Sequence, residues 1–289
     1  MSEPREPLSL FIVHWNRPGE CAATLDALLK QGVPMEATIV DNASKPDAVE
    51  LLRKHVGEKA ELVRLGENKG WGPALNVVLR RWIDEKRSRF CLLSAHDAEP
   101  SPDCIKLLLE AMERDSRIGI ACPQYADQTV PEFSALHGVQ LHVDLAKPRG
   151  TAQLVDVPHG TLLVIRRQCL EQVGLFDERY FAYGDEHELG ARAARRGWKI
   201  ALVWGASVDN PETSTPSAWR SYLFARNSLL LVRDYFGPAA AWFRALLILA
   251  NTARLIFATR DEAFAFSAKA RVKAVRDYFA GRYGRPQFE

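Results

Sequence analysis

The sequence lacks closely spaced cysteines. Its 289 residues include five Cys, at positions 21, 91, 104, 122 and 169, and no two of them form a CxxC pair. Zinc-binding modules and small domains held together by disulfides depend on closely spaced cysteines. The spacing therefore argues against both and is typical of a chain in a reducing compartment.

Three further features are missing. The N-terminal residues show neither the charged region nor the long apolar run of a secretory signal peptide. The sequence contains no internal repeat and no low-complexity tract. The formal net charge is only +2, so the composition does not indicate nucleic acid or another polyanion as a partner.

The sequence has the composition of an ordinary globular chain. Hydrophobic residues make up 47% and charged residues 26%, which is enough apolar material for a substantial core. A chain of this length forms one large domain or two small ones.

Strand-like and helix-like segments alternate over the first 122 residues. Apolar runs predict strands at residues 8–14, 37–40, 61–65, 90–95 and 118–122. Helical spacing predicts a helix that ends near Gly32 and further helices at 47–56, 73–83 and 102–114. Because the connections are short, this alternation indicates βαβ units and a mostly parallel sheet.

Polar loops follow the first four predicted strands, at residues 14–17, 41–44, 68–72 and 96–97. The carboxyl ends of parallel strands meet at one edge, where open α/β sheets hold their ligands. Turns use the same residue types, so each loop alone is weak evidence. Their agreement favours a crevice for a nucleotide.

Asp97 lies just after the apolar run 90–95 and is the first candidate functional residue. Pro100 and Pro102 follow it and cannot continue a central strand. A carboxylate at this position is placed to hold a ligand. The alternative is that Asp97 only stabilises the following turn.

The second half begins irregularly. Residues 124–156 predict loops and short antiparallel strands, and residues 161–165 predict an apolar strand followed by a helix to Val173. A helix is expected at 185–196, with acids at its start. These acids either form a solvated helix start or, because Tyr180, Phe181 and Tyr183 are close in sequence, have raised pKa values suited to proton transfer.

Seven blocks resemble, in order, the family-2 inverting glycosyltransferases of GT-A fold, and within them the bacterial rhamnosyltransferase-like branch. The blocks are IVHWNR (12–17), IVDNAS (39–44), ENKGWGPALN (67–76), LLSAHDAEPSPD (92–103), HGTLLVIRR (159–167), VGLFDERYFAYGDEHELGARAARRGW (173–198) and RN (226–227). The resemblance implies an α/β, Rossmann-like GT-A domain over residues 1–235, with a mostly parallel sheet flanked by helices. Residues 236–289 would form a helical C-terminal extension.

The resemblance also implies a donor site. His14, Asn16 and Arg17 would line the pocket for base and ribose. The other donor-binding residues that it implies are Asp41, Asn42, Ser44, Gly70, Ala74, Asn76, His96 and Arg226. Arg226 would meet the diphosphate, because a guanidinium matches phosphate bidentately.

The resemblance further implies which residues hold the metal ion and which act in catalysis. Asp97 falls on the last acid of the metal-binding motif and would hold Mg²⁺ or Mn²⁺ on the donor diphosphate, with Asp209 in place of a family His. Glu186 falls on the catalytic base, with Asp185 beside it in reversed order. It would take a proton from the acceptor hydroxyl in a single displacement. Ser94 and Ala95 stand where the family often has earlier acids. His96 and His159 would contact donor or acceptor, or are structural.

The C-terminal residues predict helices. Residues 239–258 are about as long as a membrane span, but Arg244, Asn251 and Arg254 interrupt them. A packed or interfacial amphipathic helix is the better interpretation. Residues 261–285 are basic, and the alternatives are a solvated face, a homodimer contact or attachment to an anionic membrane.

The resemblance predicts a cytoplasmic enzyme that moves rhamnose or a hexose from a dTDP- or UDP-linked donor. The acceptor would be a hydroxyl of a glycan or lipid-linked molecule in cell-surface polysaccharide synthesis. Peripheral contact with the inner face of the cell membrane is compatible with the C-terminal helices. A nucleotidyltransferase would show a glycine-rich basic loop after the first strand, which residues 14–20 do not provide. The other alternative is a catalytically impaired member that binds a nucleotide-sugar or a partner.

Overall fold

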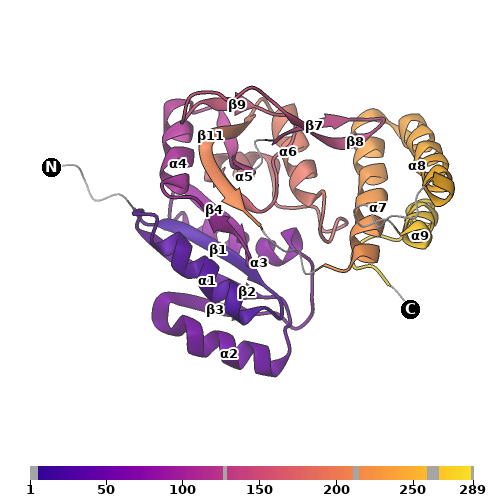
Figure 1. Ribbon diagram of the computed structural model, residues 1–289. Helices are drawn as coiled ribbons and strands as arrows, with labels where there is room; N and C mark the ends of the chain where they lie inside the picture. The colour runs from indigo at the N-terminus through magenta and orange to yellow at the C-terminus, as the bar shows by residue number, and fades with distance from the viewer. Residues whose placement is uncertain (1–5, 126–128, 211–214, 259–266, 288–289) are drawn as a thin grey trace.

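A computed structural model of the chain describes residues 6–125, 129–210, 215–258 and 267–287 (Figure 1). Its main sheet has the strand order β3-β2-β1-β4-β10-β6-β11-β5, and β9 pairs with β11. The strands are β1 (Leu8–His14), β2 (Met35–Asp41), β3 (Ala60–Arg64), β4 (Phe90–Ala95), β5 (Glu99–Pro100), β6 (Ile118–Tyr125), β9 (Ala152–Leu154), β10 (Leu162–Arg166) and β11 (Lys199–Asp209). The predicted α/β class is confirmed.

The sheet is more mixed than the sequence predicted. β1 pairs in parallel with β2 and β4, β2 with β3, and β6 with β11. β10, however, runs antiparallel between β4 and β6, and β5 and β9 run antiparallel to β11. All five side chains of β10 are buried. A fully buried apolar run contains no signal of direction, which explains why the sequence did not reveal it.

Helices cover both faces of the sheet. On one face lie α1 (Pro18–Leu29), α2 (Pro46–Val56) and α4 (Cys104–Arg114), which share a core with β1 and β4. On the other lie α3 (Gly72–Glu85), α5 (Arg167–Val173) and α6 (Asp185–Arg195). The predicted helices are therefore present, with ends shifted by a few residues. This three-layer arrangement leaves the carboxyl ends of β1, β2 and β4 accessible at one edge.

Two additions enclose that edge. The predicted antiparallel strands of the irregular segment are confirmed as the hairpin of β7 (Thr129–Ser134) and β8 (Gly138–Val143). The C-terminal helices α7 (Ser217–Phe236), α8 (Pro238–Ala258) and α9 (Ala268–Phe279) pack on one another, with α8 on the outside (Figure 1). Their core includes Phe181 from the main domain, so α7 joins both parts. The predicted domain division at residue 235 stays a prediction.

A close backbone crossing ties the loop after β3 to the turn before α6. The backbone N–H of Trp71 donates to the carbonyl of Phe181 at 2.7 Å. Gly70 has a φ of +93°, and a Cβ there would lie 1.8 Å from the carbonyl oxygen of Phe181. Only glycine fits this crossing, both because of its φ and because no space remains.

We expect Gly70→Ala to lower the free energy of unfolding by about 3 kcal/mol or more, since strain and overpacking add at this position. Gly66→Ala is the matched control in the same loop, because a Cβ there meets nothing within 4 Å. Urea denaturation of both variants measures the difference. Equal stabilities would show that the crossing does not constrain the fold.

Candidate active site

A cavity of about 760 Å³ lies at the edge that the polar loops mark. Its walls come from the ends of β1, β2 and β4, from the β7–β8 hairpin, from the turn before α6 and from α7. The cavity therefore joins the sheet edge to the C-terminal helices. Residues more than 200 positions apart in the sequence meet around it.

Beneath the cavity, a buried polar network fixes the loops after β1 and β2. Nε2 of His14 accepts from the backbone N–H of Arg17 at 3.2 Å, so its Nδ1 carries the proton and donates to Asp41 at 2.9 Å. Ser44 accepts from the backbone N–H of Asn16. Burial alone would raise the pKa of Asp41, but the hydrogen bonds from His14 and Ser44 outweigh it and leave that pKa below its usual value.

The turn that carries Asp97 is held in place from two sides. Oγ1 of Thr24 lies within hydrogen-bond distance of the carbonyls of His96 (3.0 Å) and Ala98 (3.1 Å). Pairing of β5 with β11 brings Asn210 to Asp97, and its Nδ2 lies 3.4 Å from the carboxylate. Asp97 is thus presented to the cavity beside Asn210. The predicted metal ligand Asp209 is exposed and lies outside the cavity lining.

Donors for a divalent cation gather around Asp97. Oδ1 of Asn210 and Nε2 of His96 are buried and have no hydrogen-bond partner among the described residues. Burial also lowers the pKa of His96, which keeps its ring neutral and able to ligate. No group of three or more His, Cys, Asp or Glu in the described part of the chain could hold a metal ion. The donor set therefore fits a cation that takes most of its ligands from phosphate and water.

The two acids at the start of α6 have different surroundings. Asp185 is 1% exposed, and its Oδ2 accepts from the backbone N–H of Gly72 at 2.7 Å, at the start of α3. Burial and the neighbouring charge of Glu186 raise its pKa well above the usual value. Glu186 is 9% exposed and accepts from the backbone N–H of Gly184 at 2.9 Å. A buried carboxyl of raised pKa therefore lies next to the side chain of Glu186, and both residues line the cavity.

Two histidines flank Glu186. Nε2 of His187 lies 3.5 Å from Oε1 of Glu186, and burial lowers the pKa of His187 to about 4. The ring of His159 stacks on Tyr125, and its Nε2–H donates to the carbonyl of Pro123. Its Nδ1 is buried without a partner among the described residues, and burial lowers its pKa to about 4. Both rings are therefore neutral near pH 7.

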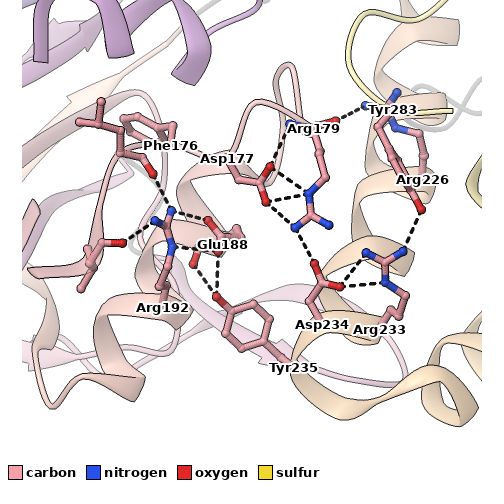
Figure 2. Close-up of polar contacts among 12 residues, drawn as sticks. Phe176, Asp177, Arg179, Glu188, Arg192, Arg226, Arg233, Asp234, Tyr235 and Tyr283 are labelled. Atoms are coloured by element: carbon pink, nitrogen blue, oxygen red, sulfur yellow. Dashed lines mark hydrogen bonds and ion pairs between the residues drawn. The ribbon is translucent and has the colours of Figure 1, made fainter. Parts of the chain in front are cut away.

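A network of ion pairs and hydrogen bonds fixes α6 and the turn before it (Figure 2). Arg192 donates to the carbonyls of Val173 (2.6 Å) and Leu175 (2.7 Å) and pairs with Glu188. The hydroxyl of Tyr235 on α7 donates to Glu188 at 2.9 Å. A second set joins Arg179 to Asp177 and to Asp234 of α7. These contacts connect the turn before α6 to both α6 and α7.

The structure brings some predicted site residues to the cavity and places others elsewhere. Those that line it are Asn42, Gly70, His96, Asp97, His159, Asp185 and Glu186. The residues absent from its lining are His14, Asn16, Arg17, Asp41, Ser44, Ala74, Asn76, Asp209 and Arg226. His14, Asn16, Asp41 and Ser44 support the lining through the buried network. Their predicted contacts with a nucleotide stay predictions.

Two residues implied for donor binding have their hydrogen-bond partners inside the protein. Arg226 is 1% exposed, and its guanidinium donates to the carbonyls of Gly284 (2.7 Å) and Tyr180 (3.0 Å), so it ties the C-terminal segment to the turn before α6. The side-chain amide of Asn76 donates through Nδ2 to the carbonyl of Phe176 and accepts through Oδ1 from its backbone N–H. Both side chains have their hydrogen bonds satisfied inside the protein.

The sequence did not single out several aromatic and polar residues that line the cavity. They are Trp15, Asn68, Trp71, Tyr125, Asn210 and Trp219. Trp15 and Trp71 lie inside loops that the sequence marked, so their size and position were an available signal. Trp219 lies on α7, more than 100 residues from any of those loops, and no spacing rule could have identified it.

Comparison with protein families gives two overlapping matches. The model of "Glycosyl transferase family 2" matches residues 9–174, and that of "Glycosyl transferase family group 2" matches residues 92–259.

Two curated relatives are similar to this chain. An N-acetylglucosaminyl-diphospho-decaprenol L-rhamnosyltransferase of Mycobacterium tuberculosis is 26% identical over 61% of this chain and 66% of its own length. The low-salt glycan biosynthesis hexosyltransferase Agl10 of Haloferax volcanii is 24% identical over 71% of this chain and 69% of its own. The chain thus spans about 66% of the mycobacterial relative.

Solved structures show the same fold. GalNAc-T7 with UDP, GalNAc and Mn²⁺ has a TM-score of 0.69 at 14% identity, over 96% of this chain and 57% of that one. The mannosyltransferase PcManGT from Pyrobaculum calidifontis, with GDP-Man and Mn²⁺, has a TM-score of 0.61 at 18% identity, over 97% of this chain and 84% of that one. The predicted GT-A fold is confirmed.

The neutral state of His159 predicts a pH dependence of stability. Its pKa in the folded protein, about 4, lies below the ordinary 6.5, so its stabilising contribution is complete above pH 6.5 and is lost as pH falls toward 4. Relative to His159→Gln, we expect wild type to lose about 2 to 3 kcal/mol of unfolding free energy across this window. Denaturant titrations from pH 7 to 4 measure the difference.

The exposed His55 on α2 supplies the control, since His55→Gln should leave the pH profile of wild type unchanged. If the profiles of wild type and His159→Gln run parallel, His159 is not held neutral by the fold.

Proposed function

Because the chain belongs to Glycosyl transferase family 2, as its motifs indicated, we propose that it is an inverting glycosyltransferase. It transfers rhamnose or a hexose from a dTDP- or UDP-linked donor to a hydroxyl of a glycan or lipid-linked acceptor, in cell-surface polysaccharide synthesis. The names of the mycobacterial and archaeal relatives support this choice of sugar and acceptor.

The arrangement of Glu186 carries the proposal. Its carboxylate lines the cavity, while the pKa of its neighbour Asp185 is raised by burial. A carboxyl group that lines the cavity beside a second carboxyl of raised pKa is suited to proton transfer. Glu186 acts as the base, and Asp185 positions it by joining α6 to the start of α3.

Gly160 gives the base its space. A Cβ at this position would lie 3.2 Å from the carboxylate carbon of Glu186, so any larger residue would crowd the carboxylate. An acceptor hydroxyl that approaches Glu186 within hydrogen-bond reach loses its proton as its oxygen attacks the anomeric carbon. One displacement inverts the configuration and needs no covalent intermediate on the protein.

Asp97, with Asn210 and His96, would hold Mg²⁺ or Mn²⁺ on the donor diphosphate. The bound cation would neutralise the charge that develops on the leaving group. Through that cation, Asp97 and Asn210 would orient the diphosphate, and the rings of His96 and His159, held neutral by burial, add no positive charge of their own. The two solved neighbours carry Mn²⁺ with a nucleotide or a nucleotide-sugar, which supports this role.

The single carboxylate in the metal motif favours one alternative, a catalytically impaired member that binds a nucleotide-sugar or a partner. Ala95 stands two residues before Asp97, where a second acid would strengthen cation binding. Nucleotide binding without transfer to any acceptor would support this alternative. Location in the cytoplasm remains part of the proposal.

Loss of the base should abolish transfer but not donor binding. We expect Glu186→Gln to lower kcat by about 10²- to 10⁴-fold, the usual contribution of a general base. Glu186→Asp should retain part of the activity, since its carboxylate sits one methylene further back. Transfer from dTDP-rhamnose and UDP-hexoses to glycan and polyprenyl-linked acceptors is measured. The exposed Glu171→Gln on α5 is the control, and full activity of Glu186→Gln would remove Glu186 from the mechanism.

The metal role of Asp97 is tested by thermal shift with dTDP, UDP and GDP, each with and without Mn²⁺ or Mg²⁺. A ligand that binds only the folded state raises Tm, and we expect the dTDP or UDP shift to grow with metal. Asp97→Asn should lose this metal-dependent increment, whereas Asp103→Asn, an exposed acid six residues later, should keep it. An increment that survives Asp97→Asn would remove Asp97 from the metal site.

A further inference from the structure

Helix α8 has a buried face and an exposed face on opposite sides. Residues that pack inward are Ala241, Arg244, Ala245, Ile248 and Thr252. The large residues on the outer face are Trp242 (58% exposed), Phe243 (52%), Leu246 (60%), Leu249 (36%) and Ile256 (56%). They recur at helical spacing over about four turns, so the outer face is a continuous apolar stripe.

Helix α9 extends this stripe into a patch. The ring centroids of Trp242 and Phe279 are 4.2 Å apart, and Phe279 and Val272 are 43% and 50% exposed. We call these two residues and the five of α8 the C-terminal apolar patch. Figure 1 shows α8 on the outside of the molecule, away from the sheet. Patches of this kind mark interaction sites, because isolated exposed apolar residues do not line up this way.

Basic residues accompany the patch. Lys269 and Arg276 lie on the same exposed face of α9 as Val272 and Phe279, at i, i+3 and i+4 spacing. Arg254 is exposed on α8 and Arg282 after α9. Residues 238–289 contain nine Lys or Arg and four Asp or Glu, a formal charge of +5, although the whole chain carries only +2. Positive charge is therefore concentrated where the apolar surface is exposed.

The contacts of helix α8 with the rest of the protein argue against its spanning a bilayer. Its segment Pro238–Ile256 is long and apolar enough to cross a membrane, with a mean hydropathy of 1.3. Arg244, however, donates to Ser228 on α7 at 2.9 Å and to the carbonyl of Leu136 at 2.6 Å. Crossing would break these contacts and expose the charged residues of α7 to lipid.

We propose that the C-terminal apolar patch docks the protein on an anionic lipid surface. Trp242, Leu246 and Ile256 enter the boundary between headgroups and acyl chains, and Lys269, Arg276 and Arg254 contact lipid phosphates. Apolar and aromatic residues beside Lys and Arg are the signature of helices that lie in this boundary. A second copy of the chain fits less well, because a two-fold interface would bring together two copies of the same positively charged surface.

Helix α8 lies between the docked face and the cavity. Arg244 on its inner face lines the cavity, together with Leu223, Phe224 and Leu231 of α7. A lipid-linked acceptor held in the same membrane would therefore reach the cavity from the side of α7 and α8. Docking itself does not depend on the transfer chemistry, so it stands or fails separately from the proposed function.

Vesicle co-sedimentation tests the proposal. The full chain is mixed with vesicles of pure phosphatidylcholine or of phosphatidylcholine with phosphatidylglycerol. We expect binding to the anionic vesicles to exceed binding to the neutral ones. It should weaken when salt rises from about 0.1 M to 1 M, which shortens the Debye length from about 10 Å to 3 Å.

Variants separate the two components of docking. Leu246→Glu should lower the partition onto anionic vesicles by at least about tenfold, since burying one Leu is worth that much. Leu154→Glu on β9 is the matched control, because Leu154 is 57% exposed and lies away from α8. Arg254→Gln with Arg276→Gln should weaken anionic binding by about fivefold per charge. None of these residues lines the cavity.

Three results would overturn the proposal. One is equal binding to neutral and anionic vesicles or no binding to either. Another is equal loss of binding in Leu246→Glu and Leu154→Glu. The third is a dimer in light scattering that Leu246→Glu dissociates while vesicle binding is absent, because a second copy would then cover the patch. A far-UV circular dichroism spectrum and a Tm equal to those of wild type show that Leu246→Glu is folded.

Discussion

The site depends on one contact, between the start of α3 and the turn that leads into α6. The backbone N–H groups of Trp71 and Gly72 donate to the carbonyl of Phe181 and the carboxyl of Asp185. A glycine without space for a Cβ allows the approach. The loop after β3 and the turn before α6 are thereby held as one unit. Glu186 follows Asp185 directly, so this contact sets where the proposed base meets the cavity.

The remaining polar groups serve the same purpose by different means. Asp97 is positioned from the other side, by Thr24 of α1 and by the short pairing of β5 with β11. The ion pair of Arg192 with Glu188 and the hydrogen bond from Tyr235 to Glu188 hold α6 in place. Buried charges of this kind cost desolvation and add little net stability, but they fix geometry once every partner is present. Such groups are therefore useful where the position of a carboxylate has to be fixed.

The C-terminal helices connect the cavity to the outer surface. Helix α7 contributes cavity-lining residues on one side and ion-pair partners for Arg179 on another. Helix α8 covers α7 and leaves its own apolar face outside. The exposed apolar face and part of the cavity wall therefore belong to one packed group of helices. The proposed membrane contact gives a physical reason for this arrangement.

The sequence alone determined the α/β class, the positions of most helices and strands, the turn in which Asp97 lies and the helix start that carries Glu186. These features follow from apolar spacing, from Gly and Pro positions and from motifs local in the chain. Tertiary structure alone decided the direction of β10, because a buried apolar run has no direction in sequence. It also decided that Arg226 and Asn76 are satisfied inside the protein, and that Asn210 rather than Asp209 meets Asp97. Burial and partner choice arise from residues distant in the chain, which no local pattern records.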